Sequence, residues 1–209
     1  MLDEDQRALV GLVREFADEV LVSAAPEYEE RSEDPAALYK QLAQLGLTGI
    51  PYPERWGGGG QPYSTYLLVV EEIARAYLGF AIGLSVHTLC AFAVNEFGSD
   101  GLKEDVLTRL CSGEWFGAYS LSEPNSGSDA AALSTKAERT EGSYRLNGSK
   151  VFCTRGDEAD AVLVMARTGT EGSKGISAFI VQKGTEGFGG SKKEEKRGWR
   201  SSPTWMLQL

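Results

Sequence analysis

The stretch Ala118-Tyr119-Ser120-Leu121-Ser122-Glu123-Pro124-Asn125-Ser126-Gly127-Ser128-Asp129 stands just after the point where the sequence changes its pattern. Before it, apolar residues recur at three- and four-residue intervals, which is typical of helices with one buried face. From Trp115 onward, apolar and polar residues alternate and turn residues become frequent, which is typical of strands. We therefore predict an all-α domain over residues 1–113 and a β-domain over residues 114–209. A run of helices followed by a run of strands indicates an α+β fold with segregated domains.

Five helices are predicted in the first domain, over residues 9–21, 35–45, 64–77, 80–97 and 102–110. The helix of residues 80–97 is apolar on nearly all sides, so we expect it at the centre of the bundle. The residues expected to face the core in the second and third helices are Leu38, Leu42, Leu45, Leu67, Val70, Ile73 and Ala74.

The predicted ends of these helices follow from capping residues. Asp34 supplies an N-cap with Pro35 at the first helical position, and Gly46 offers a C-cap. Ser64 can cap the third helix in the same way. The glycine run of residues 57–60 suggests a phosphate loop, but no Lys-Ser/Thr follows it and no strand precedes it. A flexible connector between helices is therefore favoured.

The second domain is predicted to form a β-barrel-like sheet. Asn147-Gly148 is the strongest short hairpin signal in the chain, with Leu146 before it and Val151 on the returning strand. The apolar runs of residues 161–166 and 176–181 predict two further strands.

The charge and the scarce metal-ligating residues exclude several classes of function. The 209 residues carry a formal net charge of −9, which argues against a nucleic-acid binder because such proteins normally present a basic patch. Cys90, Cys111 and Cys153 lie far apart and show neither a disulfide framework nor metal spacing. His87 is the single histidine and stands in an apolar run, so we expect it to be packed in the core and expect no metal site.

Nothing in the sequence predicts a targeting or membrane segment. The N-terminus is acidic, which fits neither a secretory signal nor an Arg-rich transit peptide. The longest apolar stretch, residues 78–94, contains polar residues and is short for a bilayer, so it is interpreted as a buried core helix.

Two segments could carry chemistry. The exposed N–H groups and hydroxyls of residues 118–129 could form a nest for an anion, although a plain polar β-loop has the same composition. In the segment 147–156, Phe152 and Thr154 are two apart and share one face of a strand. A ring to stack on and a hydroxyl to donate suit a planar cofactor, and cross-strand packing would explain the pair equally well.

The residues 118–129, 146–156 and 193–204 resemble, in order and spacing, the middle domain of acyl-CoA dehydrogenases. The helical half is similar to the N-terminal domain of the same family, including residues 46–51 and the turn of residues 56–58. The resemblance covers essentially the whole chain. Two departures are mild, because Ser122 stands where threonine is common and Phe152 where tryptophan is common.

The resemblance implies FAD as the cofactor. Backbone groups at Leu121 and Ser122 would meet the pyrimidine edge of the flavin, and Ser128 would meet the pyrophosphate and also contact the acyl-CoA. The Thr154 hydroxyl would lie near flavin N5. The full set of residues implied to bind the cofactor is Tyr119, Leu121, Ser122, Gly127, Ser128, Phe152, Cys153 and Thr154.

The resemblance also implies an activity, partners and a third domain. The expected reaction is α,β-dehydrogenation of a fatty or branched acyl-CoA, with electrons passed to an electron-transfer flavoprotein by a dimeric or tetrameric enzyme. The family's C-terminal helical domain carries the catalytic glutamate, and we expect this chain to lack both. Its candidates, Glu71, Glu72 and Glu123, do not match that base, so no catalytic residue is predicted and the chain alone is expected to be inactive.

Two other functions remain open. One is a non-catalytic remnant that binds acyl-CoA or flavin, and the other is a flavin oxidase or monooxygenase of the same fold. The expected compartment is the cytoplasm for a bacterial protein and the mitochondrial matrix for a eukaryotic one.

Overall fold

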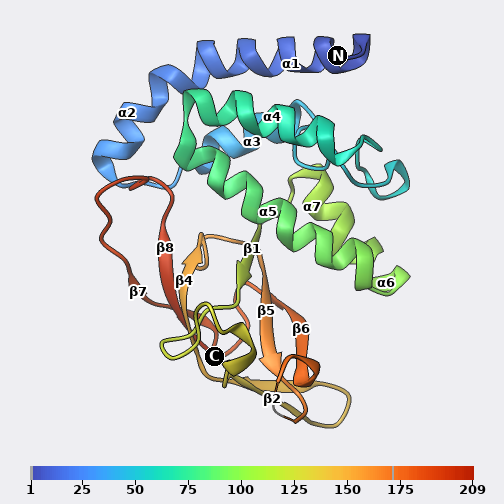
Figure 1. The fold of residues 1–209 in the computed structure, drawn as a ribbon, viewed down its shortest axis with the longest axis vertical. Helices are drawn as coiled ribbons and strands as arrows, with labels where there is room; N and C mark the ends of the chain where they lie inside the picture. The colour runs from blue at the N-terminus through green and yellow to red at the C-terminus, as the bar shows by residue number, and fades with distance from the viewer. Residues whose placement is uncertain (1, 171) are drawn as a thin grey trace. The chain divides into compact units, whose positions relative to one another are not determined.

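A computed structural model describes residues 2–170 and 172–209 of the chain. The chain divides into two compact units (Figure 1). The helical unit runs to Phe116 and also includes Lys196–Ser202. The sheet unit comprises Gly117–Glu195 and Pro203–Leu209. Helices therefore precede strands along the chain, and the predicted α+β class is confirmed.

The helical unit is built from long helices joined by short turns. Its elements are α1 (Glu4–Phe16), the π-helical segment η1 (Ala17–Leu21), α2 (Val22–Arg31), α3 (Ala36–Gln44), the 3-10 helix η2 (Glu54–Trp56), α4 (Tyr63–Ala76), α5 (Leu78–Phe97), α6 (Asp100–Leu102), the π-helical segment η3 (Lys103–Leu107) and α7 (Thr108–Ser112). A capping box starts α1, because Asp3 accepts from the Gln6 N–H at 2.8 Å and the Gln6 side chain accepts from the Asp3 N–H at 3.3 Å. All five predicted helices are present, with the first extended to Arg31.

Two of the predicted caps are wrong. Helix α3 begins at Ala36 with Pro35 itself in the N-cap position, one residue later than Asp34. Helix α4 begins at Tyr63 after Pro62, so Ser64 lies inside the helix. In both places a proline carbonyl accepts the first helical N–H. Proline fits this position because its missing N–H would have no partner within the helix.

The core of the helical unit forms around α5. Ten residues of α5 are buried, and the Tyr39 ring stacks on Phe80 with centroids 4.1 Å apart while its hydroxyl donates to the Phe80 carbonyl at 2.9 Å. Helix α5 is not covered along its whole length as a fully central helix would be, because Leu78 is 44% exposed, Leu89 42% and Phe97 82%. Leu45 and Leu67 are also exposed, against prediction, at the ends of the apolar stripes of α3 and α4.

Helix α5 is also the one element of the described residues with the length and composition to cross a membrane. More than half of the relevant window is buried inside the protein. A core helix passes the same test, so this is weak evidence for a membrane span.

The glycine run is a connector, as predicted, but a closely packed one. The Gly59 N–H donates to the Gly49 carbonyl at 3.0 Å and the Gly60 N–H to the Tyr52 carbonyl at 2.8 Å. A Cβ atom at Gly58 would lie 2.2 Å from the Tyr52 carbonyl oxygen. Glycine is therefore required at residue 58 by the close approach of two backbone segments.

The segment Lys196–Ser202 is bound to α2 within the helical unit. The Glu29 carboxylate accepts from the Arg200 N–H at 2.8 Å, from the Ser201 N–H at 3.2 Å and from the Ser201 hydroxyl. Arg200 Nε donates to the Ser32 hydroxyl at 3.1 Å. One carboxylate thus fixes the backbone at Arg200 and Ser201, and these hydrogen bonds lower the pKa of Glu29 against the effect of burial.

The sheet unit contains two sheets. In the first, β1 (Gly117–Ser120) pairs parallel to β5 (Ala161–Arg167), which pairs antiparallel to β6 (Ile176–Gln182). The same sheet continues through one bridge to β2 (Lys136–Arg139), which pairs antiparallel to β3 (Tyr144–Asn147). The second sheet has the order β4 (Ser149–Thr154), β8 (Thr204–Gln208), β7 (Gly189–Lys193). Short 3-10 turns occur at η4 (Ala130–Ala132) and η5 (Ser173–Gly175).

The strands predicted at residues 161–166 and 176–181 are confirmed as β5 and β6, and the hairpin predicted at Asn147-Gly148 is wrong. Strands β3 and β4 lie in different sheets, and Gly148 is the corner between them. A Cβ atom at Gly148 would lie 2.5 Å from Thr135 Oγ1, so glycine is needed here for close packing. The hairpin instead joins β2 to β3, where the Thr140 N–H donates to the Ser143 carbonyl at 3.0 Å.

Candidate functional site

The candidate site begins with the loop that follows β1. A tight turn closes on itself where the Glu123 N–H donates to the Ser126 carbonyl at 2.8 Å and the Ser126 N–H donates back at 3.1 Å. The Ser126 hydroxyl donates to the Asp129 carbonyl at 2.8 Å. Within the described residues, the N–H groups of Ser122, Gly127 and Ser128 have no protein acceptor. These donors are available to a ligand, and the anion nest stays a prediction.

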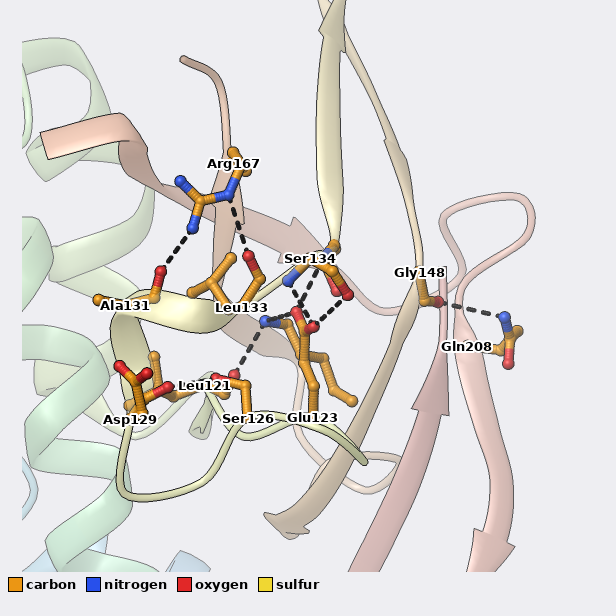
Figure 2. A network of polar contacts seen from close by, with 12 residues as sticks. Leu121, Glu123, Ser126, Asp129, Ala131, Leu133, Ser134, Gly148, Arg167 and Gln208 are labelled. Carbon is orange, nitrogen blue, oxygen red and sulfur yellow. Dashed lines mark hydrogen bonds and ion pairs between the residues drawn. The ribbon is translucent and has the colours of Figure 1, made fainter. Parts of the chain in front are cut away.

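The Glu123 carboxylate holds the base of this loop (Figure 2). One of its oxygens accepts from the Ser134 N–H at 2.6 Å and the Ser134 hydroxyl at 2.8 Å. The other accepts from the Thr135 N–H at 2.9 Å and from Lys150 Nζ at 2.8 Å. The carboxylate therefore joins the start of the loop to its end and to β4.

Lys150 and Glu123 form a buried ion pair. The side chain of Lys150 is 0% exposed and that of Glu123 is 3% exposed. Desolvation alone would raise the pKa of Glu123, but the hydrogen bonds from Lys150, Thr135 and Ser134 outweigh it and lower the pKa to about 2. Burial lowers the pKa of Lys150, and the hydrogen bond to Glu123 opposes that effect. Glu123 is thus ionised at neutral pH.

Strand β4 lies directly beside the loop. The Val151 N–H donates to the Ser122 carbonyl at 2.8 Å, and the Cys153 thiol donates to the Tyr119 carbonyl at 3.3 Å. Lys150 Nζ donates to the Leu121 carbonyl at 2.9 Å. The two segments singled out in the sequence are therefore neighbours in space, although about 30 residues separate them along the chain.

Phe152 and Thr154 occupy an irregular part of β4. The pairing with β8 shifts register between Lys150 and Cys153, and Phe152 has a left-handed φ of 57°. Its ring is 68% exposed, and Thr154 is partly exposed. A bulky residue in this conformation is strained, and such strain is commonly found at binding sites. The prediction that these two side chains share a cleft with Ser122 and Ser128 stays a prediction.

Two of the remaining candidates point toward the protein interior. The side chain of Cys153 is buried, and burial raises the pKa of its thiol to about 12. Tyr119 is half-buried on β1, and burial raises its pKa as well. Any contact of Cys153 with a ligand would therefore be made by its backbone.

Arg167 is a second anchor of the loop that the sequence did not indicate (Figure 2). Its guanidinium donates to the Ala131 carbonyl at 2.7 Å and the Leu133 carbonyl at 3.0 Å. It also donates to the Thr170 carbonyl at 2.8 Å and the Gly172 carbonyl at 3.2 Å. The contacts to Ala131 and Leu133 fix the turn that follows Asp129, and all four use carbonyl groups that no sequence pattern marks.

The geometry fits a planar anionic cofactor. The loop presents open N–H donors, and the neighbouring strand presents an exposed aromatic ring next to a hydroxyl. Among the described residues, no group of three or more His, Cys, Asp or Glu side chains could hold a metal ion.

Comparison with known proteins assigns the chain to a family. Residues 3–114 match the acyl-CoA dehydrogenase N-terminal domain, and residues 118–209 match the acyl-CoA dehydrogenase middle domain. The chain therefore belongs to the acyl-CoA dehydrogenase family of flavin-dependent oxidoreductases.

Individual relatives agree with that assignment. A short-chain-specific acyl-CoA dehydrogenase of Clostridium acetobutylicum is 40% identical over 208 residues, which are 99% of this chain and 55% of that protein. The butyryl-CoA dehydrogenase structure from Megasphaera elsdenii superposes with a TM-score of 0.94 at 38% identity, over 100% of this chain and 56% of that one. The chain thus spans about half the length of the relatives it matches.

Two further structures show the range of related proteins. A chain in a structure described as an electron transferring flavoprotein of Acidaminococcus fermentans has a TM-score of 0.97 and 37% identity, covering 100% of this chain and 56% of that one. A structure of PigA with FAD and proline has a TM-score of 0.94 and 28% identity, with the same coverage.

Proposed function

We propose that this chain provides the FAD-binding half of an acyl-CoA dehydrogenase. One observation carries the proposal: the loop after β1 and strand β4, the two segments implied to bind the cofactor, are hydrogen-bonded neighbours. The family assignment and a structural relative described with FAD support the same cofactor.

The residues of the loop would bind the polar parts of FAD. The free N–H of Ser122 would donate to the pyrimidine edge of the flavin, and those of Gly127 and Ser128 would face the pyrophosphate. Backbone donors suit this task because the chain's net charge of −9 provides no attractive field for an anion. When bound, the flavin supplies the hydride acceptor for dehydrogenation of an acyl-CoA.

The residues of β4 would orient the flavin ring. Phe152 offers an exposed aromatic face for stacking, and the Thr154 hydroxyl would donate a hydrogen bond near N5. A hydrogen bond of this kind contributes about 0.5–1.5 kcal/mol.

None of the three candidate glutamates, Glu71, Glu72 and Glu123, is suited to remove the α-proton. Glu123 is buried with four hydrogen bonds, and a pKa of about 2 makes it a very weak base. Glu72 is bound by Arg14 and Arg75, which lower its pKa, and Glu71 is exposed on α4. We propose that the base belongs to a further domain of a longer protein and that this chain alone has no turnover.

The proposed substrates and partners follow from the family. The substrate is an acyl-CoA that contacts Ser128, and the electron acceptor is an electron-transfer flavoprotein. The complete enzyme would be a dimer or tetramer, located in a bacterial cytoplasm or a mitochondrial matrix.

Two alternative functions fit the same fold. A flavin oxidase or monooxygenase of this fold would share the FAD site, and a likeness to the prolyl acyl carrier protein oxidase AnaB, with a TM-score of 0.93 at 27% identity, supports it. A remnant without turnover would bind acyl-CoA or flavin but would not form part of a larger enzyme.

Titration of the purified chain with FAD tests the proposal, followed by anaerobic addition of short, branched and long acyl-CoAs. We expect weak binding of FAD and no bleaching of the visible flavin band. Absence of FAD binding contradicts the cofactor assignment, whereas bleaching at the rate of a full-length relative shows that a base exists within these residues.

A further inference from the structure

The buried lysine of the sheet unit contacts the candidate FAD site through one peptide group. Lys150 Nζ donates to the Leu121 carbonyl at 2.9 Å as well as to Glu123 at 2.8 Å. The Leu121 carbonyl belongs to the same peptide group as the Ser122 N–H, which has no acceptor among the described residues. The ammonium and the open donor therefore lie at opposite ends of one amide.

We propose that Lys150, held in place by Glu123, is a positioning residue that orients and polarises the Leu121–Ser122 peptide toward the pyrimidine edge of FAD. This inference rests on the proposed function. It adds a role for two residues that are not expected to touch the cofactor.

Lys150 is shielded from water, which strengthens its effect on the groups that it contacts. A buried ammonium that donates to an amide carbonyl, and not to water, strengthens the dipole of that amide, because hydrogen bonds in a chain polarise one another. The Ser122 N–H becomes a stronger donor, and its effect is largest when the flavin edge gains negative charge on reduction. Lys150 should therefore favour both FAD binding and FAD reduction.

Glu123 has a different part in the same arrangement. It fixes Lys150 and closes the loop through Ser134 and Thr135, whereas the hydrogen bond to the Leu121 carbonyl comes from Lys150. The two residues should therefore contribute similarly to folding and unequally to the cofactor. A purely structural ion pair would not show this separation.

The test uses the whole chain as wild type, Lys150→Met, Glu123→Gln and the double variant Lys150→Met/Glu123→Gln. Lys192→Met is a matched control, because it removes an exposed lysine of the same sheet unit that lies 3.7 Å from Glu194. Three quantities are measured: the urea midpoint of unfolding, the dissociation constant for FAD and the fraction of bound FAD that is reduced at the wild-type midpoint potential.

We expect the two single variants to lower the urea midpoint and the double variant to recover much of it, since both buried charges are then absent. Lys150→Met and the double variant should both weaken FAD binding about tenfold or more, the usual loss for an outer-shell partner of a bound group. In both, a smaller fraction of FAD is reduced at the wild-type midpoint potential. Glu123→Gln should have a smaller effect on FAD, and Lys192→Met none.

Wild-type affinity and reduction in the folded double variant would overturn the inference and leave the proposed function intact. Failure of the wild-type chain to bind FAD would overturn the proposed function and the inference with it.

A measurement on the wild type alone covers the case of misfolded variants. Addition of FAD should shift the nitrogen resonances of both the Ser122 amide and the Lys150 ammonium. A shifted amide with an unmoved ammonium would show that the two are not coupled and would overturn the inference.

Discussion

Replacing Glu123 by glutamine should destabilise the chain in a manner that depends on pH. Each oxygen of the Glu123 carboxylate accepts two hydrogen bonds, so an amide nitrogen in either position faces two donors. The variant also leaves the ammonium of Lys150, which is 0% exposed, without its counter-charge. Removing one partner of a buried ion pair costs about 3–5 kcal/mol.

The pH dependence follows from the pKa of Glu123. Its pKa is lowered from 4.5 to about 2, so the unfolded chain takes up the proton first as the pH falls. The stabilisation is complete above the unfolded pKa, near 4.5, and is lost as the pH falls through about 2. This difference corresponds to about 3 kcal/mol, which agrees with the cost of removing the partner.

Urea unfolding of wild type and Glu123→Gln at pH 7, 4.5 and 3 measures this effect. The difference in unfolding free energy should be about 3–5 kcal/mol at pH 7 and should shrink between pH 4.5 and 3. The control is Glu138→Gln, which makes the same chemical change at an exposed residue of β2 and should cost less than about 0.5 kcal/mol. A difference that is small at pH 7, or that stays constant across the three pH values, would refute the reasoning.

Three further predictions concern other parts of the molecule. Gly58→Ala should destabilise the helical unit by about 1–3 kcal/mol in urea unfolding, because its Cβ would lie 2.2 Å from the Tyr52 carbonyl oxygen. Gly11→Ala, at an open position inside α1, should instead stabilise it by up to about 1 kcal/mol, and equal effects would contradict the packing argument. Burial raises the pKa values of the Cys111 and Cys153 thiols to about 12. At pH 7.5 these thiols should react with iodoacetamide far more slowly in the folded chain than in the chain unfolded by urea, and equal rates would show that they are accessible. Thr154→Val should shift the visible spectrum of bound FAD through loss of one hydrogen bond worth about 0.5–1.5 kcal/mol, and an unchanged spectrum would remove Thr154 from the site.

The sequence predicted elements whose signals are local. The apolar runs of β5 and β6 and the long apolar helix α5 needed no knowledge of their partners. The Asn147-Gly148 hairpin failed because a glycine close to another backbone segment has the same sequence signature as a glycine in a turn. Only the proximity of Thr135 distinguishes the two cases.

The candidate site was predictable in part. Composition and resemblance to a family singled out the loop at Ser122–Ser128 and the strand at Phe152–Thr154, which are neighbours in space, and their contact with FAD stays a prediction. The ion pair between them was not, because a lysine in the middle of a strand is normally taken to be exposed. Its burial depends on Glu123, which is 27 residues away in sequence. Arg167 was missed for a related reason, since its partners are backbone carbonyls.

Amide-resolved hydrogen exchange of the chain with and without FAD tests the central claim most directly. The account predicts that FAD slows exchange at Ser122, Gly127 and Ser128, whose N–H groups are open in the free protein, and at Thr154 on β4. Unchanged exchange in these residues at saturating FAD, or protection confined to the helical unit, would contradict the assignment of the flavin site to this loop and strand.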